Sequence, residues 1–354
     1  MTNPAISDGV KVSVVIPVFN DEGTIAATLE SALAQRFEGG FEVMVVNDGS
    51  TDGTRAELAK FGDRIRVIDQ ENAGVAMARN AGIAAAAGEY IALLDGDDTW
   101  TEDKLEKTVR VLDKNPACVA AFSNVMEVDG AGKEVSCFVS PEFQHSPTLD
   151  EMLAWPWPHL PSATVIRRDT ILAIGGFSEE FKAEHWGGED LFTFLLVRER
   201  GEILYVPEVL VRRQLREFRA HYANRLHSRR FEIDSAQAFR EFERRFEGNI
   251  IFARLMREHF GARGRKVAEW AIDRVGRELI GVGLMAMHDG NRGFARRCYR
   301  ASIRYRPLEL KTYVRLAWAV LPASIARMLS PMLAPGLRRS LSGPPFHGLP
   351  GRPQ

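Results

Sequence analysis

The first hundred residues alternate short apolar runs with segments of helical periodicity, and this alternation restricts the fold more than any other feature of the chain. The run VSVVIPV at 12–18 is β-branched and almost continuously apolar, which predicts a strand buried on both faces. Three further strand-like runs follow, at 41–46, 65–69 and 90–94. Helical patterns separate the four runs, at 24–36, 54–61 and 75–87. Repeated strand–helix–strand units predict an α/β fold with a mostly parallel sheet flanked by helices.

Beyond residue 98 the pattern becomes less regular. It indicates helices at 103–114 and 189–200, an extended segment at 118–128 and a strand at 203–211, and it turns helical from about 219 to 341. The last dozen residues are rich in proline and glycine, which is typical of a disordered tail. We therefore expect an α/β domain at 1–224, an all-α basic region at 225–341 and a tail at 342–354.

The formal net charge of −1 conceals two regions of opposite charge. Residues 1–224 carry 21 Lys+Arg and 36 Asp+Glu, whereas residues 225–354 carry 25 Lys+Arg and 11 Asp+Glu. Such an asymmetry indicates that the two regions face different partners. An apolar content of 45 % is enough for a large core and excludes wholesale disorder.

Three widely spaced cysteines are typical of reduced thiols in the cytoplasm rather than of a disulfide framework or a metal site. Residues 1–11 have neither a basic start nor an apolar stretch, so no signal peptide is predicted. The most apolar window, 316–335, contains Arg327 and two internal prolines and is not expected to span a membrane. These features favour a cytoplasmic protein.

Acidic loops follow three of the predicted strands, at 20–22, 47–52 and 95–98. Ligands of open parallel sheets bind at the carboxyl ends of the strands, where these loops would meet. The first loop lacks the glycine pattern of dinucleotide-binding folds, and no P-loop pattern occurs. Clustered carboxylates repel a bare phosphate, so a phosphorylated ligand is expected to arrive with a divalent cation, Mg or Mn.

Five motifs in this region occur in an order and spacing that resemble the family 2 glycosyltransferases. They are VSVVIPVFNDEGTI, VVNDGSTDGT, ENAGVAMARNAG, GEYIALLDGDD and GGED, and together they span about the first 210 residues. The resemblance implies a GT-A fold and a metal-dependent, inverting transfer of a sugar from a nucleoside-diphosphate-sugar, with UDP the favoured nucleotide. The acceptor would be a hydroxyl of a glycan or glycolipid in cell-surface polysaccharide assembly.

The same resemblance assigns roles to the acidic loops. Asp95-Gly96-Asp97 looks like the D-x-D element of the family, in which Asp97 would bind the metal and Asp95 would face the nucleotide sugar. Gly96 would let the backbone approach closely. The alternative is an Asp/Gly turn that closes a strand.

Other matched residues surround the expected nucleotide. Asp48 would accept a hydrogen bond from the base, and Pro17, Phe19 and Glu22 match the loop around base and ribose. Arg79 would lie near the nucleotide, or would balance the carboxylates around it. Ser50 and Thr51 are also suited to helix capping.

Asp190 matches the catalytic base of inverting members, and Glu189 is the second candidate. The alternative for Asp190 is a purely structural role, because the helix dipole favours an acid at a helix N-terminus. The pKa of Asp190 would be low there unless burial opposes the dipole. Trp186, just upstream, would line the acceptor side, although a packed tryptophan is the commoner case. Arg212 or Arg213 lies where many members place an arginine near the diphosphate.

Processive members carry a Q-x-x-R-W motif and transmembrane spans. This chain has QLREF at 214–218 and no predicted span, which favours transfer of a single sugar.

The region from residue 225 has 23 arginines and two lysines. Three alternatives stay open for it: packing against the acidic domain or a second subunit, contact with an anionic membrane surface, and nucleic-acid binding, which is disfavoured because no recognition motif occurs. Residues 281–306 predict a helical hairpin that turns at 289–291.

Two other functions are alternatives to sugar transfer. A nucleotidyltransferase would need a glycine-rich basic loop after the first strand, which is lacking. A degenerate transferase fold could serve as a scaffold for the basic helices. The sequence does not identify the sugar, the acceptor or the oligomeric state.

Overall fold

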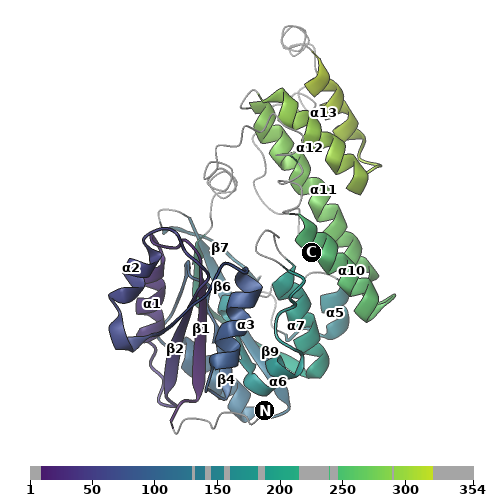
Figure 1. Cartoon of the computed structure of the whole chain (residues 1–354). Coiled ribbons are helices and arrows are strands. Elements are labelled where there is room, and N and C mark those ends of the chain that lie inside the picture. Colours follow the sequence, from purple (N-terminus) through teal and green to yellow (C-terminus); the bar gives the residue numbers. More distant parts are fainter. Residues whose placement is uncertain are drawn as a thin grey trace.

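The computed structural model describes residues 9–129, 132–139, 145–154, 160–181, 188–214, 239, 246–288 and 291–321. Within these ranges, helices flank a nine-stranded mixed sheet and further helices follow it toward the C-terminus (Figure 1). The predicted fold class, an α/β sheet domain followed by an all-α region, is confirmed.

The first four strands form the parallel part of the sheet, as the alternating pattern predicts. They are β1 (Val12–Val18), β2 (Phe41–Asn47), β3 (Arg66–Asp69) and β4 (Tyr90–Leu93), in the spatial order β3-β2-β1-β4. Every residue of β1 is buried, because β2 and β4 pair with its two edges and helices cover both faces.

The later strands extend this sheet with mainly antiparallel pairs. They are β5 (Asp98–Trp100), β6 (Cys118–Val128), β7 (Glu134–Cys137), β8 (Thr164–Arg167) and β9 (Glu202–Gln214). The order continues from β4 as β8-β6-β9-β5, with β7 beside β6, and only β6 and β9 pair in parallel. β9 continues past its predicted end at residue 211 because β5 and β6 pair with its last residues.

Each face of the sheet packs against its own set of helices. One core includes residues of α1 (Ile25–Leu33), α2 (Thr54–Ala59) and α4 (Lys104–Lys114). The other includes residues of α3 (Val75–Ala85), α5 (Leu149–Ala154), α6 (Arg168–Ala173) and α7 (Glu189–Arg200). Two short 3-10 helices, η1 (Gly62–Arg64) and η2 (Pro161–Ala163), complete this unit.

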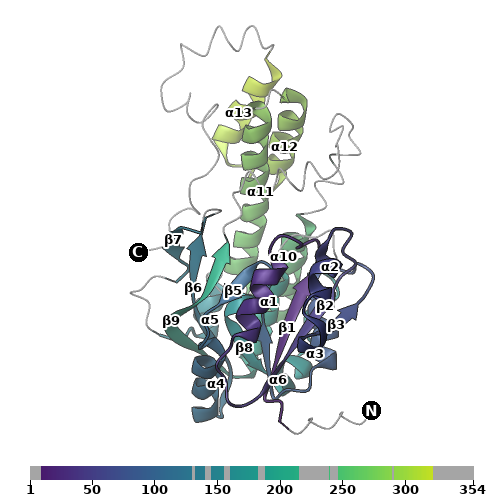
Figure 2. The ribbon, with the colours of Figure 1, turned by 90° about the vertical axis from the view of Figure 1, so that its left-hand side faces the viewer.

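Four helices form the described C-terminal part, α10 (Glu247–Phe260), α11 (Arg265–His288), α12 (Arg292–Tyr305) and α13 (Leu310–Val320). α10 and the start of α11 join the core around α7, to which they contribute Phe252, Met256 and Val267. The rest of α11 leads away from the sheet to α12 and α13 (Figures 1 and 2). These helices share a third core, called the outer core below. α11 ends and α12 begins on either side of the turn predicted at 289–291, of which residues 289 and 290 lie outside the described residues.

Ion pairs also join the basic helices to the acidic unit, as the first of the three alternatives expects. Arg254 of α10 pairs with Glu180, and Arg263 pairs with Asp150 of α5 at 2.9 Å. The predicted boundary at 224, residues 322–341 and the tail at 342–354 lie outside the described residues. None of the described helices has both the length and the apolar character needed to cross a bilayer.

Candidate active site

The acidic loop after β4 packs tightly against the end of β1. A Cβ atom at Gly96 would lie 2.8 Å from Asp21 Oδ2 and 3.1 Å from Val18 Cγ1, so only glycine fits without movement. The carbonyl oxygen of Gly96 accepts a hydrogen bond of 3.0 Å from Thr28 Oγ1. The loop is thus held between β1 and α1, with Asp95 and Asp97 half-buried on either side of the glycine.

Ser162 of η2 fixes this loop from the other side, and sequence analysis did not single it out. Its Oγ accepts a hydrogen bond of 3.0 Å from the Asp95 N–H and donates one of 2.5 Å to Asp98 Oδ2. Asp98 is 3 % exposed. Burial, with the nearby charges of Asp95 and Asp97, raises the pKa of Asp98 well above the usual range. A lone serine in a 3-10 helix of three residues offers no sequence signal for this role.

Arg79 of α3 bridges two loops that are far apart in the sequence. Its Nη2 lies 2.8 Å from Asp95 Oδ1, and its Nη1 lies 3.5 Å from Glu189 Oε1 at the start of α7. Its guanidinium also lies 5.0 Å from the ring centre of Phe177. Burial alone would lower the pKa of Arg79, but the surrounding carboxylates raise it overall. Arg79 therefore balances buried negative charge, as one of its two predicted roles requires.

Glu189 and Asp190 begin α7 directly after Gly188, which adopts a left-handed conformation with φ of 101°. Burial raises the pKa of Glu189 to about 7, helped by the charge of Asp190 and opposed by Arg79. Burial also raises the pKa of Asp190, although Arg79 and a 2.7 Å hydrogen bond from the Leu191 N–H oppose the shift. Burial thus outweighs the helix N-terminus at both carboxylates, which makes them suited to accept a proton near neutral pH.

Asp48 follows β2 and organises the loop before α3. Its Oδ1 accepts hydrogen bonds from Gln70 Nε2 at 2.7 Å and the Ala73 N–H at 2.9 Å, and its Oδ2 accepts one from the Gly74 N–H at 2.8 Å. The side chain is 3 % exposed. Asp48 therefore shapes this loop, and its contact with a nucleotide base stays a prediction.

Reciprocal hydrogen bonds join the two loops predicted to surround the nucleotide. The Thr51 N–H donates to Asn20 Oδ1 at 2.8 Å, the Asn20 N–H donates to Ser50 Oγ at 3.0 Å, and the Gly53 N–H donates to Glu22 Oε2 at 2.7 Å. Asn20 has a φ of 58°, a conformation that asparagine tolerates better than most residues. These bonds hold the two loops together.

The other predicted residues of this region differ in exposure. Phe19 is 46 % exposed, as a ring available for stacking would be. Pro17 is buried within β1, beside Val46 of β2, so it supports the loop from below.

The two predicted diphosphate arginines lie within β9 rather than after it. Arg213 lies opposite Asp98 in the register of β5 and β9, and its charge partly opposes the rise in the pKa of that carboxyl. Arg212 points to a different partner, Glu134, at 2.8 Å. Arg213 is therefore the one connected to the acidic loop. Trp186 and residues 155–159 lie outside the described residues.

A divalent cation would find carboxylate oxygens here, although not a complete cage. No group of three or more Asp, Glu, His or Cys side chains is placed to hold a metal among the described residues. Mg is commonly bound by one or two protein carboxylates together with substrate phosphates and water. The half-buried pair Asp95 and Asp97 fits that type of site.

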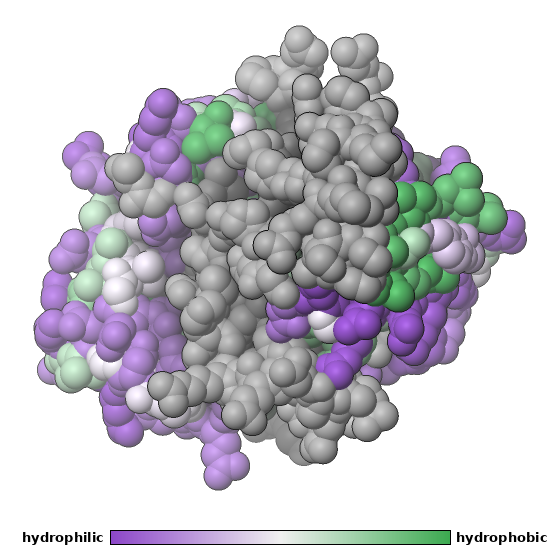
Figure 3. Space-filling view, turned by 90° about the horizontal axis from the view of Figure 1, so that it is seen from above, coloured by the Kyte–Doolittle hydropathy of each residue, from purple (hydrophilic) through white to green (hydrophobic). Residues whose placement is uncertain are grey.

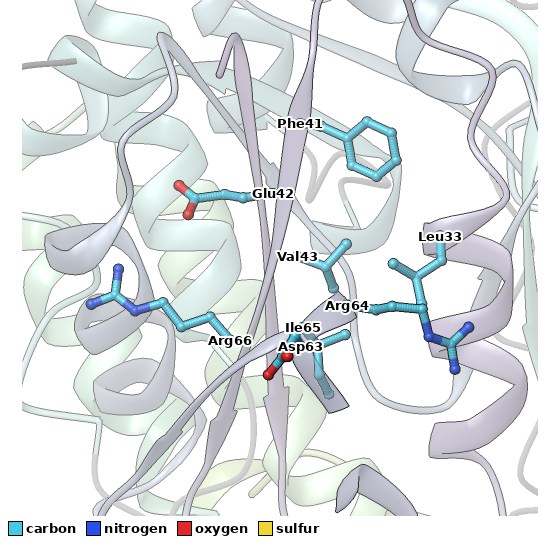
Figure 4. A pocket seen from close by; sticks show the side chains of 8 residues that line it. All are labelled: Leu33, Phe41, Glu42, Val43, Asp63, Arg64, Ile65 and Arg66. Atoms are coloured by element: carbon cyan, nitrogen blue, oxygen red, sulfur yellow. The ribbon is translucent and has the colours of Figure 1, made fainter. Parts of the chain in front are cut away.

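A surface hollow lies at the opposite end of the parallel strands (Figure 4). Its lining comes from the end of α1, the start of β2, and the segment from η1 to the start of β3: Leu33, Phe41, Glu42, Val43, Asp63, Arg64, Ile65 and Arg66. It is remote from the carboxylate loops, because those follow the carboxyl ends of the strands.

Carboxylates and an arginine gather at the carboxyl edge of the parallel strands, an arrangement that fits a GT-A-type fold, the fold class that comparison with solved structures also gives. Structures of S. aureus TarS match with TM-scores of 0.51 and 0.52 at 18 % identity. The match to the complex with UDP covers 87 % of this chain and 90 % of the TarS chain. The match to the structure titled without ligand covers 94 % of this chain and 87 % of the TarS chain. Residues 13–171 match the sequence model described as glycosyl transferase family 2.

Curated relatives match over parts of their length. An uncharacterised glycosyltransferase of Rickettsia prowazekii (strain Madrid E), RP339, is 30 % identical over 58 % of this chain and 64 % of its own. The succinoglycan biosynthesis protein ExoO of Rhizobium meliloti (strain 1021) is 40 % identical over 42 % of this chain and 43 % of its own. The glucosyltransferase WfgD of Escherichia coli is 36 % identical over 38 % and 53 %. The chain thus spans less than two thirds of each of these relatives.

Proposed function

We propose that this protein transfers a single sugar from a nucleoside-diphosphate-sugar to a hydroxyl of a glycan or glycolipid, with inversion and with a divalent cation. The observation that carries the proposal is the bridge through Arg79. It brings the loop predicted to hold the donor, at Asp95, together with the helix start predicted to hold the base, at Glu189 and Asp190. Donor and acceptor chemistry need these two elements side by side.

Each residue of the proposed site has a task that its environment suits. Asp190 would remove the proton of the acceptor hydroxyl, since burial raises its pKa above that of an exposed aspartate. Arg79 would hold Asp95 in place for the donor, and the loops closed by Asn20 and Glu22 would surround the nucleotide. When bound at Asp97, Mg or Mn would stabilise the negative charge of the diphosphate leaving group.

Relatives support the donor and acceptor classes. Two TarS structures are titled as complexes, one with UDP and one with UDP-GlcNAc, and the printed name of WfgD describes transfer from UDP-Glc to a sugar on diphosphoundecaprenol. A UDP-sugar donor and a lipid-linked acceptor are therefore proposed. A lipid-linked acceptor would favour work in the cytoplasm at the inner face of the membrane.

The test measures turnover of UDP-sugars by release of UDP, with Mn present or removed by a chelator. We expect turnover only with the cation, and a loss of at least about a hundredfold in kcat for Asp190→Asn, the range in which general base catalysis contributes. Asp97→Asn should raise the Mn concentration needed for half-maximal rate. Lys60→Gln, a change at an exposed residue of the same unit, serves as the control.

Near-normal transfer by both Asp97→Asn and Asp190→Asn would show the site assignment to be wrong. If no nucleoside diphosphate binds to the natural chain in the presence of Mn by calorimetry, the protein is a scaffold and not a transferase.

A further inference from the structure

The last described helix, α13, exposes apolar side chains along one side. Its apolar face, defined here as Leu310, Tyr313, Val314, Ala317 and Val320, follows helical spacing and is exposed throughout. Leu310 is 77 % exposed and Val320 52 % exposed, and the preceding Leu308 is 91 % exposed. The opposite side, with Thr312 and Ala319, is buried against the neighbouring helices. Contiguous exposed apolar side chains on a helix usually mark a contact surface.

The neighbouring helix α12 presents arginines on its outer side. This arginine face consists of Arg292, Arg296, Arg297, Arg300 and Arg304, all half-buried or exposed. The inner side of α12 packs into the outer core through residues such as Phe294, Cys298 and Tyr299. The helix is therefore divided sharply into an apolar inner side and a cationic outer side.

The two faces adjoin, because Arg292 reaches the end of α13. Its Nη2 donates hydrogen bonds to the carbonyl oxygens of Trp318 at 2.5 Å and Leu321 at 2.7 Å. Residues 291–321 contain seven arginines and one lysine but a single acidic residue, Glu309. In the view from above, Figure 3 shows hydrophobic residues gathered at the right-hand edge. This is the side on which α13 lies in Figure 1.

We propose that the apolar face of α13 and the arginine face of α12 form a docking surface for a bilayer that contains anionic phospholipids. An interfacial helix buries its apolar side at the boundary of headgroups and acyl chains, and nearby arginines attract anionic headgroups. A second copy of the chain fits less well, because two such surfaces brought together would oppose their arginines. Docking stands on these residues alone, whereas its use in bringing the site to a lipid-linked acceptor rests on the proposed function.

The experiment is flotation of the full chain with vesicles of phosphatidylcholine, prepared with and without phosphatidylglycerol. We expect flotation with the anionic vesicles and a loss as NaCl is raised, since salt screens the arginine contacts. The variant Leu310→Glu/Val314→Glu should lose flotation, because it places charge on the apolar face. Its matched control, Val135→Glu/Leu172→Glu, changes exposed apolar residues of the sheet unit and should float like the natural chain.

A single arginine tests the electrostatic part. An arginine near an anionic surface contributes about 1 kcal/mol, so Arg300→Gln should lower the partition into anionic vesicles about fivefold. Arg110→Gln removes an exposed helical arginine of α4 and should leave the partition unchanged.

Three results would overturn the docking surface: no flotation of the natural chain, unchanged flotation of Leu310→Glu/Val314→Glu, or a dimer in sedimentation that this variant dissociates. The last result would assign the surface to contacts between copies. UDP release with a water-soluble acceptor, measured in parallel, separates the two proposals, because the α13 variant should keep that activity.

Discussion

At the scale of single residues, Ser162 is the position where the structure adds most to the site. Its hydroxyl ties the Asp95 N–H to the buried carboxyl of Asp98. We expect Ser162→Ala to destabilise the fold by about 1–3 kcal/mol, the cost of leaving a buried polar partner unsatisfied, and to lower kcat because the loop of Asp95 is released. Urea unfolding and UDP release measure the two effects.

Ser123 provides the matched control for that change. Its Oγ is buried and makes no hydrogen bond within the described part of the chain. Ser123→Ala removes the same atom without breaking a pair, so its stability should stay unchanged or rise slightly. Equal losses in the two variants would contradict the role given to Ser162.

The pair of acids at the start of α7 predicts an unusual pH dependence. Arg79, Asp95 and Asp190 face Glu189, whose pKa burial raises to about 7. Because Glu189 pairs with Arg79 as a carboxylate, kcat/KM should fall as the pH drops below about 7, by about tenfold per pH unit. In Glu189→Gln this fall should no longer occur near pH 7, because the carboxyl that titrates there is removed. An unmoved profile would assign the ionisation to another group.

Some of these residues could be predicted and others could not. The motif positions Asp48 and Asp95 lie at the carboxyl edge of the sheet, because each follows a parallel strand, and Arg79 links Asp95 to Glu189, the neighbour of Asp190. Their partners Ser162, in the three-residue η2, and Gln70, just after β3, lie in segments too short for a periodic pattern to mark a contact. The raised pKa of Asp190 also depends on burial, which a helix-start motif does not reveal.

At the scale of elements, the close packing of α3 on the sheet depends on a glycine in the middle of the helix. A Cβ at Gly82 would lie 2.4 Å from Val15 Cγ1 of β1 and 3.3 Å from Val46 Cγ2 of β2. Gly82→Ala should therefore destabilise the fold by about 1–3 kcal/mol, although alanine is the better helix former. Gly23→Ala, where the new atom meets open space, should be neutral in the same urea experiment. Similar effects in both would contradict the packing argument.

The elements differ in how clearly the sequence marks them. β1 and α7 are well predicted, because a continuous apolar run and a long helical period are strong local signals. β5 and β8 have three and four residues and escape prediction, since strands so short exist only through their pairing with β9, β4 and β6. The end of β9 is set in the same way by long-range pairing.

At the scale of the whole molecule, the acidic and basic regions contact each other through ion pairs. Their opposite charges therefore do not serve separate partners alone. α10 lies against α7 and is joined to the sheet unit by apolar packing and ion pairs, whereas α12 and α13 lie beyond it with their own core. The charge split alone could not distinguish these two parts of the basic region. The inner part supports the site, and the outer part carries the surface proposed for lipid.

This division predicts that two similar core changes have different effects on catalysis. Phe252 of α10 is 1 % exposed, and its Cβ lies 2.9 Å from the position that a Cβ of Gly188 would take, directly before Glu189 and Asp190. Phe252→Ala keeps this Cβ but removes the ring from the core that α10 shares with α7, so it should cost about 3–5 kcal/mol and lower kcat as well. Phe294 of α12 is 3 % exposed and lies in the outer core. Phe294→Ala should destabilise α11–α13 by a similar amount but leave kcat for a water-soluble acceptor unchanged well below the unfolding temperature. Equal losses of kcat would mean that the outer helices also position the base.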